Sequence, residues 1–220
     1  MNNKTFTLED QKLLEDLMLH RRDVRGNNFL HDEVSEQAIE KILNAASLAP
    51  SVGFSQPWEF VVIRDSKTKK QVHDSFKVEN QKAETEFSDQ RQAAYKSLKL
   101  EGILEAPVNI AVFYKPTNQP VLGQASMPEV GEYSVVCAIQ NMWLMARAMN
   151  IGIGWVSILD PKHVKTILKS PDNNKLVAYL CVGYVKEFYS EPELQKLKWA
   201  QRKEIKSTVF NDSYPPNSNC

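Results

Sequence analysis

Residues 133–146 form the longest uncharged, apolar-rich run of the chain, and this run most constrains the fold. Its apolar residues would cover nearly every face of a helix, which predicts burial from all sides. The run falls short of the roughly 18 to 20 residues that a bilayer-spanning helix needs. In a chain of 220 residues, such a helix, beginning near Glu132, favours an interface between two copies, and a central helix of a monomeric core is the alternative.

Short β-branched or aromatic runs alternate with helical patterns along the rest of the chain. They lie at residues 60–63, 108–113, 153–158 and 176–182, and their composition predicts strands of a sheet. No low-complexity stretch is long enough to link two domains. We therefore expect residues 1–220 to form a single α/β or α+β domain.

Capping signals predict two helices before the first strand. Thr7 and Asp10 form a capping box for a helix that ends where a cluster of arginines begins. Ser35 can cap a second helix, whose inward face carries Ile39 and Ile42. The segment 49–57 then contains two prolines and a glycine, which predicts a polar loop before the next strand.

Three further segments lack a core pattern. Residues 77–102 are strongly charged with sparse apolar positions, and they predict a cover, the candidate lid. Residues 115–131 are rich in proline and glycine, and so long an irregular loop indicates a segment next to a functional site. After Val185 the chain turns polar, although Trp199 and Phe210 indicate that this C-terminal extension (residues 186–220) docks at least in part.

The overall charge offers no general attraction to a polyanion. Lys and Arg number 27, as do Asp and Glu, so we expect neither a nucleic acid nor a membrane surface as a partner. Cys137, Cys181 and Cys220 are far apart and odd in number, which is typical of a reducing compartment, and the first two are expected in the core. Residues 1–15 show no secretory signal pattern, so a cytoplasmic protein is expected.

A dense basic cluster follows the first predicted helix. Arg21, Arg22 and Arg25 place three guanidinium groups within five residues, a set that can hold a phosphate through bidentate contacts. A solvated helix end is the alternative, because the helix dipole favours cations at a C-terminus. Asp23 lies among the arginines, and it either pairs with them or has a role of its own, such as moving a proton.

Two further motifs have the composition of ligand contacts. The segment A-P-S-V-G-F-S-Q-P-W at 49–58 concentrates hydroxyl, amide and N–H groups that can bind a planar heterocycle, and an ordinary helix-to-strand connection is the alternative. The segment G-I-G-W-V-S at 152–157 lacks the third glycine of a dinucleotide-binding loop, and its glycines precede a strand instead of following one, so we do not expect such a loop here. Ser157 lacks the nucleophile elbow of hydrolases, so a strand hydroxyl bonded to backbone is its ordinary interpretation. No spacing typical of a metal site is present.

Taken in order, the basic cluster, the 49–58 loop and the 152–158 strand resemble the FMN-binding motifs of the nitroreductase superfamily. R-R-D-V-R at 21–25, Y-K-S-L-K-L-E-G-I at 95–103, M-P-E-V-G-E-Y-S-V-V-C-A-I-Q-N at 127–141 and Y-L-C-V-G-Y at 179–184 resemble its flavin-destructase branch, over nearly the full length. Ordinary nitroreductases commonly carry a serine and an asparagine where this chain has Asp23 and Ser55. Both departures weaken the assignment to a generic nitroreductase.

The resemblance implies an α+β fold with a mixed central sheet flanked by helices, in an intertwined homodimer with one FMN pocket at each subunit boundary. It implies that the arginines hold the FMN phosphate, that the 51–56 loop faces the flavin or ribityl chain, and that residues 77–104 close the site as the candidate lid. The FMN-contacting residues that it implies are Arg21, Arg22, Asp23, Val24, Arg25, Ser51, Ser55, Gln56, Leu104, Ser157 and, from the extension, Arg202.

The activity of this branch implies oxygen-dependent fragmentation of reduced FMN to 5,6-dimethylbenzimidazole, the lower ligand of cobalamin, and erythrose 4-phosphate. Asp23 is then expected to transfer protons at the ribityl chain, and Ser157 to hydrogen-bond near the reactive flavin edge. Reduced FMN is the substrate, O2 the co-substrate, and NAD(P)H acts only indirectly, through a separate flavin reductase. Two alternatives stay open: an FMN-dependent NAD(P)H reductase of nitroaromatics, quinones or halogenated aromatics, and a non-catalytic flavin-binding protein.

Overall fold

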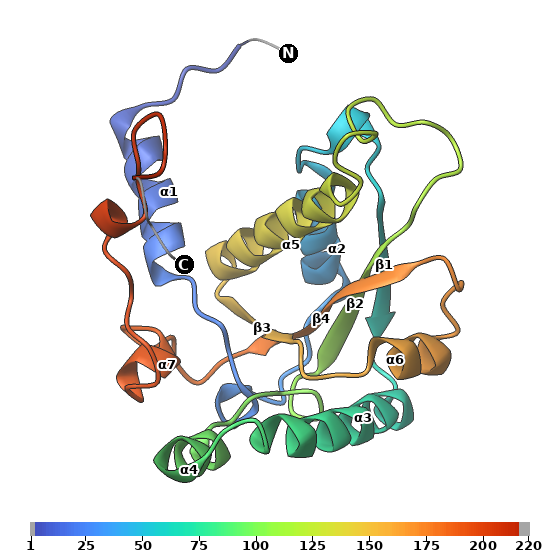
Figure 1. The fold of residues 1–220 in the computed structure, drawn as a ribbon, viewed down its shortest axis with the longest axis vertical. Coiled ribbons are helices and arrows are strands. Elements are labelled where there is room, and N and C mark those ends of the chain that lie inside the picture. Colours follow the sequence, from blue (N-terminus) through green and yellow to red (C-terminus); the bar gives the residue numbers. More distant parts are fainter. Residues whose placement is uncertain (1–2, 216–220) are drawn as a thin grey trace.

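The computed structural model describes residues 3–215, and within them four strands form a single sheet with the order β1-β2-β4-β3. Helices precede, connect and follow the strands, which gives an α+β architecture (Figure 1). The elements in chain order are α1 (Leu8–His20), η1 (Gly26–Asn28), α2 (Glu36–Ser47), η2 (Val52–Phe54), β1 (Trp58–Ile63), α3 (Ser66–Glu84), α4 (Asp89–Ser97), β2 (Val108–Tyr114), α5 (Val130–Ala148), β3 (Ile151–Val156), α6 (Pro161–Leu168), β4 (Lys175–Tyr184), α7 (Glu193–Lys196) and η3 (Ile205–Ser207).

The strands of the sheet pair antiparallel: β1 with β2, β2 with β4, and β4 with β3. The parallel contribution comes from Asp23, which forms an isolated bridge with Ile153 on β3. Because β3 is an edge strand, the segment that follows α1 lies along that edge. Within residues 3–215, the mixed character implied by the resemblance is confined to this bridge.

Helices cover both faces of the sheet (Figure 1). On one face α2 and α5 contribute Ile42 and Met142 to a core in which both side chains are fully buried. On the other face α3 and α6 contribute Val72 and Val164, which are also fully buried. The predicted capping of α2 by Ser35 is confirmed, since its hydroxyl accepts a hydrogen bond from the N–H of Ala38.

Helix α1 has the predicted start but covers no core. Thr7 and Asp10 form the capping box, and the basic cluster begins at the C-cap. Among the described residues none of the α1 side chains is buried, and Leu13 and Met18 are 62% and 48% exposed. The helix therefore presents an apolar surface that its own chain leaves uncovered.

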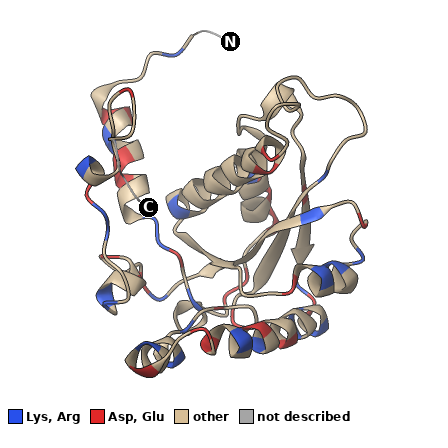
Figure 2. Cartoon of the chain, in the orientation of Figure 1, with Lys and Arg blue, Asp and Glu red and all other residues tan. Residues whose placement is uncertain are grey.

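Helix α5 is buried on one face only, so the expectation of burial from all sides is wrong for a single chain. Tyr133 and Val136 are 53% and 42% exposed on the opposite face. Cys137 is also exposed, which contradicts its expected core position, whereas Cys181 on β4 is buried as expected. Cys220 lies outside the described residues. Figure 2 shows that α5 carries charge near its ends and is almost free of it along its middle.

Strand β3 ends earlier than the sequence predicts. It runs from Ile151 to Val156, so Ser157 follows the strand and does not belong to it, and its side chain is exposed.

The predicted lid segment comprises the end of α3, all of α4 and the connection toward β2, with charges of both signs (Figure 2). None of the helices formed by residues 3–215 is long and apolar enough to cross a membrane.

Candidate active site

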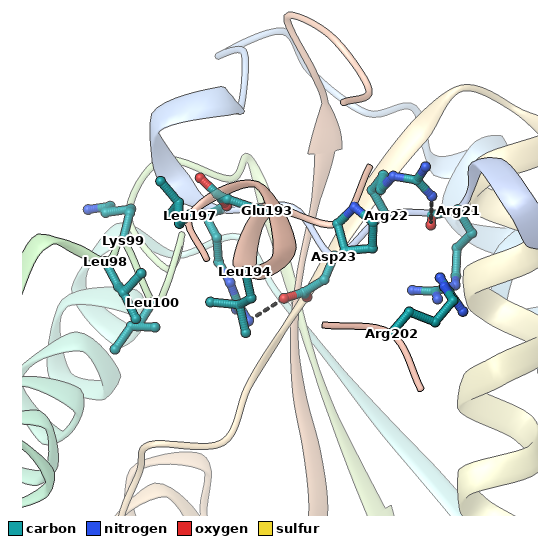
Figure 3. A pocket seen from close by; sticks show the side chains of 12 residues that line it. Arg21, Arg22, Asp23, Leu98, Lys99, Leu100, Glu193, Leu194, Leu197 and Arg202 are labelled. Atoms are coloured by element: carbon teal, nitrogen blue, oxygen red, sulfur yellow. Dashed lines mark hydrogen bonds and ion pairs between the residues drawn. The ribbon is translucent and has the colours of Figure 1, made fainter. Parts of the chain in front are cut away.

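The C-terminal extension closes over a cavity of about 160 Å³ beside the basic cluster. Three parts of the chain meet there: the segment after α1, the residues after α4, and α7 with the residues that follow it (Figure 3). Small-molecule pockets usually measure about 300–1,000 Å³, so this cavity by itself is small for a cofactor-sized ligand. The walls are formed by Arg21, Arg22, Asp23, Arg25, Leu98, Lys99, Leu100, Pro192, Glu193, Leu194, Leu197 and Arg202.

Two glycines of β3 let the basic segment approach the sheet closely. A Cβ at Gly154 would overlap the carbonyl group of Val24, and a Cβ at Gly152 would collide with the Val24 side chain. Val24 is buried, and its N–H donates a hydrogen bond to the carbonyl oxygen of Ile153 at 3.0 Å. Because side chains alternate along an extended chain, Asp23 and Arg25 both point away from the buried Val24. The G-I-G sequence thus serves backbone packing.

Asp23 and Arg25 form an ion pair that is anchored on the backbone of Trp155. One carboxylate oxygen of Asp23 accepts a hydrogen bond from the Trp155 N–H at 2.9 Å, and the other pairs with the Arg25 guanidinium. Arg25 also donates to the Trp155 carbonyl oxygen at 3.0 Å. Burial raises the pKa of the Asp23 carboxyl, while Arg25 and the Trp155 N–H oppose the rise. The acid is fixed in orientation and binds a proton more readily than an ordinary aspartate.

Arg22 differs from its neighbours because its guanidinium is bound to backbone. It is 7% exposed, and it donates hydrogen bonds to the carbonyl oxygens of Leu19 and Arg21 and to those of Tyr189 and Ser190. These bonds tie the beginning of the C-terminal extension to the end of α1. Of the predicted phosphate ligands, Arg22 therefore has the least freedom to turn toward a ligand.

Positive charge is concentrated at this end of the cavity. The guanidinium of Arg21 stacks on the Trp143 ring, 4.9 Å from its centroid, and Arg202 reaches the cavity from the extension. Burial lowers the pKa of Arg22, and the charges of Arg21, Arg202 and Arg147 lower it further. A bound anion relieves such mutual repulsion, so this set of cations suits a phosphate group.

Sequence reasoning missed the cavity residues that come from α7 and from the end of the candidate lid. Glu193 lines the cavity; burial raises the pKa of its carboxyl, Arg25 lowers it and Asp23 raises it. Lys99 lines the same cavity, and its ammonium pairs with Glu101 at 2.8 Å. Glu193 stands in a polar stretch without periodicity. Lys99 stands in the 95–103 motif, to which the resemblance assigned no ligand contact at this position.

The other predicted ligand contacts lie outside this cavity. The Ser51 hydroxyl accepts a hydrogen bond from the N–H of Gln56 at 3.0 Å, and the Ser55 hydroxyl is buried with no partner among the described residues. Leu104 lies in a separate hollow beside α3, and Ser157 is exposed after β3. One chain therefore does not bring these residues together with the basic cluster.

Helix α5 separates the two groups of predicted ligand residues. Near its N-terminus, the Ser134 hydroxyl accepts a hydrogen bond from the N–H of Val52 at 3.1 Å and holds the 51–56 loop. Near its C-terminus, the Trp143 indole N–H donates to the carbonyl oxygen of Arg22 at 3.1 Å and holds the basic segment. At 1.5 Å of rise per residue, the two anchor points are roughly 14 Å apart along the helix.

The nitroreductase family pattern matches residues 18–184, from the last turn of α1 to the end of β4. The chain belongs to the nitroreductase family. The matched region of this nitroreductase-family chain includes the basic segment, the 51–56 loop and β3, and it leaves out the C-terminal extension. The resemblance drawn from the motifs is confirmed.

Relatives of this chain within the nitroreductase family include two proteins that share one name. The 5,6-dimethylbenzimidazole synthase of Rhodospirillum rubrum is 46% identical over 86% of this chain and 90% of that protein. The 5,6-dimethylbenzimidazole synthase of Rhodobacter capsulatus is 37% identical over 89% and 95% of the two chains. A crystal structure of iodotyrosine deiodinase bound to FMN and 3-iodo-L-tyrosine superposes with a TM-score of 0.72 at 20% identity, over 91% of this chain and 99% of that chain. The structural likeness confirms the nitroreductase-like α+β fold.

Proposed function

We propose that this chain is a 5,6-dimethylbenzimidazole synthase that acts on reduced FMN and O2. The observation that carries the proposal is the Asp23 carboxylate, an acid anchored by Arg25 and Trp155 in the wall of a cation-rich cavity. Fragmentation of the ribityl chain requires a proton acceptor beside it, which a phosphate-binding cluster alone does not provide. The 46% identity to the Rhodospirillum rubrum enzyme of that name supports the proposal.

The donor set of the cavity suits the phosphate end of FMN. Arg21, Arg25 and Arg202 line the cavity, and guanidinium groups bind phosphate through paired, charge-assisted hydrogen bonds. Arg22 adds positive charge while its own donors hold the backbone. Reduced FMN supplies the chemistry, because with O2 it is converted into 5,6-dimethylbenzimidazole and erythrose 4-phosphate.

Asp23 and Ser157 are assigned the two chemical roles. The raised pKa of Asp23 makes its carboxylate a stronger proton acceptor than an ordinary aspartate, and Arg25 keeps it oriented while it is charged. The exposed hydroxyl of Ser157 is assigned a hydrogen bond near the reactive edge of the flavin. Val24 acts through its buried side chain, which holds the segment that carries Asp23.

A second copy of the chain is proposed to complete each site. The uncovered apolar surfaces of α1 and α5 are of the kind that marks a protein interface. If two α5 helices pack antiparallel about a two-fold axis, the N-terminal end of one lies beside the C-terminal end of the other. That arrangement brings the partner subunit's 51–56 loop, with its Ser51, Ser55 and Gln56, toward the basic segment.

Water must be kept out of the cavity, and reduced FMN must be supplied to it. The candidate lid (residues 77–104) and the C-terminal extension exclude water from the cavity during turnover. A separate flavin reductase in the cytoplasm supplies reduced FMN from NAD(P)H. The chain described here then needs no nicotinamide site of its own.

The decisive experiment supplies the purified protein with excess FMN, NAD(P)H and an independent flavin reductase in air. Flavin absorbance is followed over time, and the products are identified by mass spectrometry. We expect irreversible loss of the flavin absorbance together with 5,6-dimethylbenzimidazole. Full recovery of the flavin on reoxidation, with or without turnover of a nitroaromatic or halogenated aromatic substrate, would refute the proposal and favour a reductase or a flavin-binding protein.

A further inference from the structure

We propose that Trp199 is a latch that joins the C-terminal extension to the candidate lid, so that the two cover the cavity as one unit. The latch acts at the site of the proposed function, and its role in catalysis rests on that function. Trp199 does not line the cavity, so the proposal makes it a positioning residue.

The Trp199 ring packs against an aromatic pair on the candidate lid. It meets Phe87 edge to face, with centroids 5.4 Å apart, and lies 6.3 Å from the Tyr95 ring. The Arg91 guanidinium lies over the indole ring, 4.1 Å from its centroid. Contacts of these kinds each stabilise an arrangement beyond simple burial.

The receiving surface on the candidate lid is itself fixed. Phe87 and Tyr95 stack with centroids 5.1 Å apart, and Tyr95 is buried. The Tyr95 hydroxyl donates a hydrogen bond to the side-chain oxygen of Asn80 on α3 at 2.8 Å. The ring of Trp199 therefore docks on the junction of α3 and α4, not on a loose side chain.

The backbone around Trp199 directs its ring toward that surface. Lys198 adopts a left-handed conformation with φ of 57°, which reverses the chain directly after α7. The Trp199 N–H then donates to the carbonyl oxygen of Leu194 at 2.8 Å. The turn places Trp199 between two stretches of the extension that line the cavity, Glu193 to Leu197 on one side and Arg202 on the other.

The extension is thus held at two points, and α7 lies between them. Arg22 binds the carbonyl oxygens of Tyr189 and Ser190 at the first point, and Trp199 docks on α4 at the second. A hollow of about 350 Å³ lies between α4 and residues 197–199, and the indole of Trp199 lines it. Leu98, which follows Tyr95 closely in sequence, lines the cavity beside the basic cluster.

The test is hydrogen exchange of the full chain without added flavin, comparing the wild type with Trp199→Ala and Trp199→Phe. In Trp199→Ala we expect amide exchange to rise roughly tenfold both in α4 and in residues 192–202, because opening of one segment releases the other. Trp199→Phe should restore most of the protection, because a ring remains to pack against Phe87. The control is Phe210→Ala, whose ring contacts Tyr214 within the extension.

Faster exchange in residues 192–202 with unchanged exchange in α4 would overturn the latch. So would equal exchange in all variants. A second measurement uses the fragmentation assay, in which the latch predicts a raised KM for reduced FMN in Trp199→Ala and partial rescue in Trp199→Phe. If the wild type forms no product but the exchange pattern appears, the proposed function fails while the latch stands.

Discussion

The main chain of Val24 occupies the space that a side chain on Gly154 would need. Two hydrogen bonds lie along this contact. The N–H of Val24 donates to the carbonyl oxygen of Ile153, and the N–H of Trp155 donates to the Asp23 carboxylate. The position of the candidate catalytic acid is therefore set by a glycine on the adjacent strand, distant in sequence.

Gly154→Ala should displace the basic segment from β3. Overpacking of this kind costs about 1–3 kcal/mol, so the melting temperature should fall by several degrees, and FMN affinity should fall with it because Asp23 and Arg25 move. Differential scanning calorimetry and FMN titration measure both effects. An unchanged melting temperature would mean that the two segments separate without strain.

Asp23→Asn should keep FMN binding and lose product formation. The amide oxygen can still accept the Trp155 hydrogen bond, but the side chain can no longer take up a proton, and loss of such a group typically costs about 100- to 10,000-fold in rate. Binding of oxidised FMN is measured by quenching of flavin fluorescence, and product by mass spectrometry. A variant that still yields 5,6-dimethylbenzimidazole at the wild-type rate removes Asp23 from the mechanism.

Ser157→Ala should likewise bind FMN with little change and form less product, since the exposed hydroxyl is assigned to the reacting flavin edge. The same two measurements apply. Ser47→Ala is a suitable control, because the exposed Ser47 hydroxyl donates to the carbonyl oxygen of Asn44 at the end of α2. Equal product yields from the Ser157 and Ser47 variants would contradict the role.

Arg25→Ala should weaken FMN binding and move the pH profile. Each lost charge-assisted hydrogen bond is worth about 1.5–3 kcal/mol, or roughly 10- to 100-fold in the dissociation constant. Asp23 must be deprotonated to accept a proton, so activity falls as the pH drops through its pKa, which lies above the ordinary value of 3.8. Arg25 holds that pKa down, so its removal raises the pKa further and shifts the acid limb of kcat to higher pH.

Arg25→Lys is the matched variant for this profile. It keeps a positive charge beside Asp23 but loses the fork of donors, so it should weaken binding while the acid limb stays close to that of the wild type. The measurement is kcat at saturating reduced FMN across the pH range. An acid limb that stays in place in Arg25→Ala would show that the arginine does not set the pKa of Asp23.

Mixing two variants with weakened FMN binding should restore activity if each site is shared between chains, when reduced FMN saturates the wild type but leaves each variant alone nearly inactive. Arg25→Ala and Gln56→Ala change the two groups of residues that α5 holds apart. In a mixed dimer, one site carries both changes and the other carries neither, so refolding the variants together should recover about a quarter of the wild-type activity, from half of the dimers with one intact site each. No recovery from a mixture shown to contain mixed dimers would mean that each chain builds its own site.

The helices and strands follow from local patterns, so the sequence predicted most of them. Thr7 and Ser35 start their helices as predicted, because a capping hydroxyl needs only its nearest neighbours in the chain. The strand limits near Ser157 were missed, because pairing of β3 with β4 ends at Val156 and Tyr179, and that register is a tertiary property.

The candidate site was predicted where charge is dense in sequence and missed where it is assembled in space. Arg21, Asp23 and Arg25 stand together in the chain, where the arginines left open an anion site or a solvated helix end until the order of the motifs indicated FMN. Glu193 and Lys99 reach the same cavity from distant segments, and neither stands in a cluster of like charges in the chain. The contrasting roles of Arg22 and Arg25 depend on which carbonyl groups each guanidinium meets, which only the fold determines.

The separation imposed by α5 has a consequence for how such a protein behaves in a cell. The cationic half of the proposed site lies toward one end of the helix and the 51–56 loop toward the other. If each site is shared between two copies as proposed, a newly made chain is inert until it meets a second copy. Below the dissociation constant of the pair, the activity per chain would then fall with the concentration of the protein itself, however much reduced FMN is supplied.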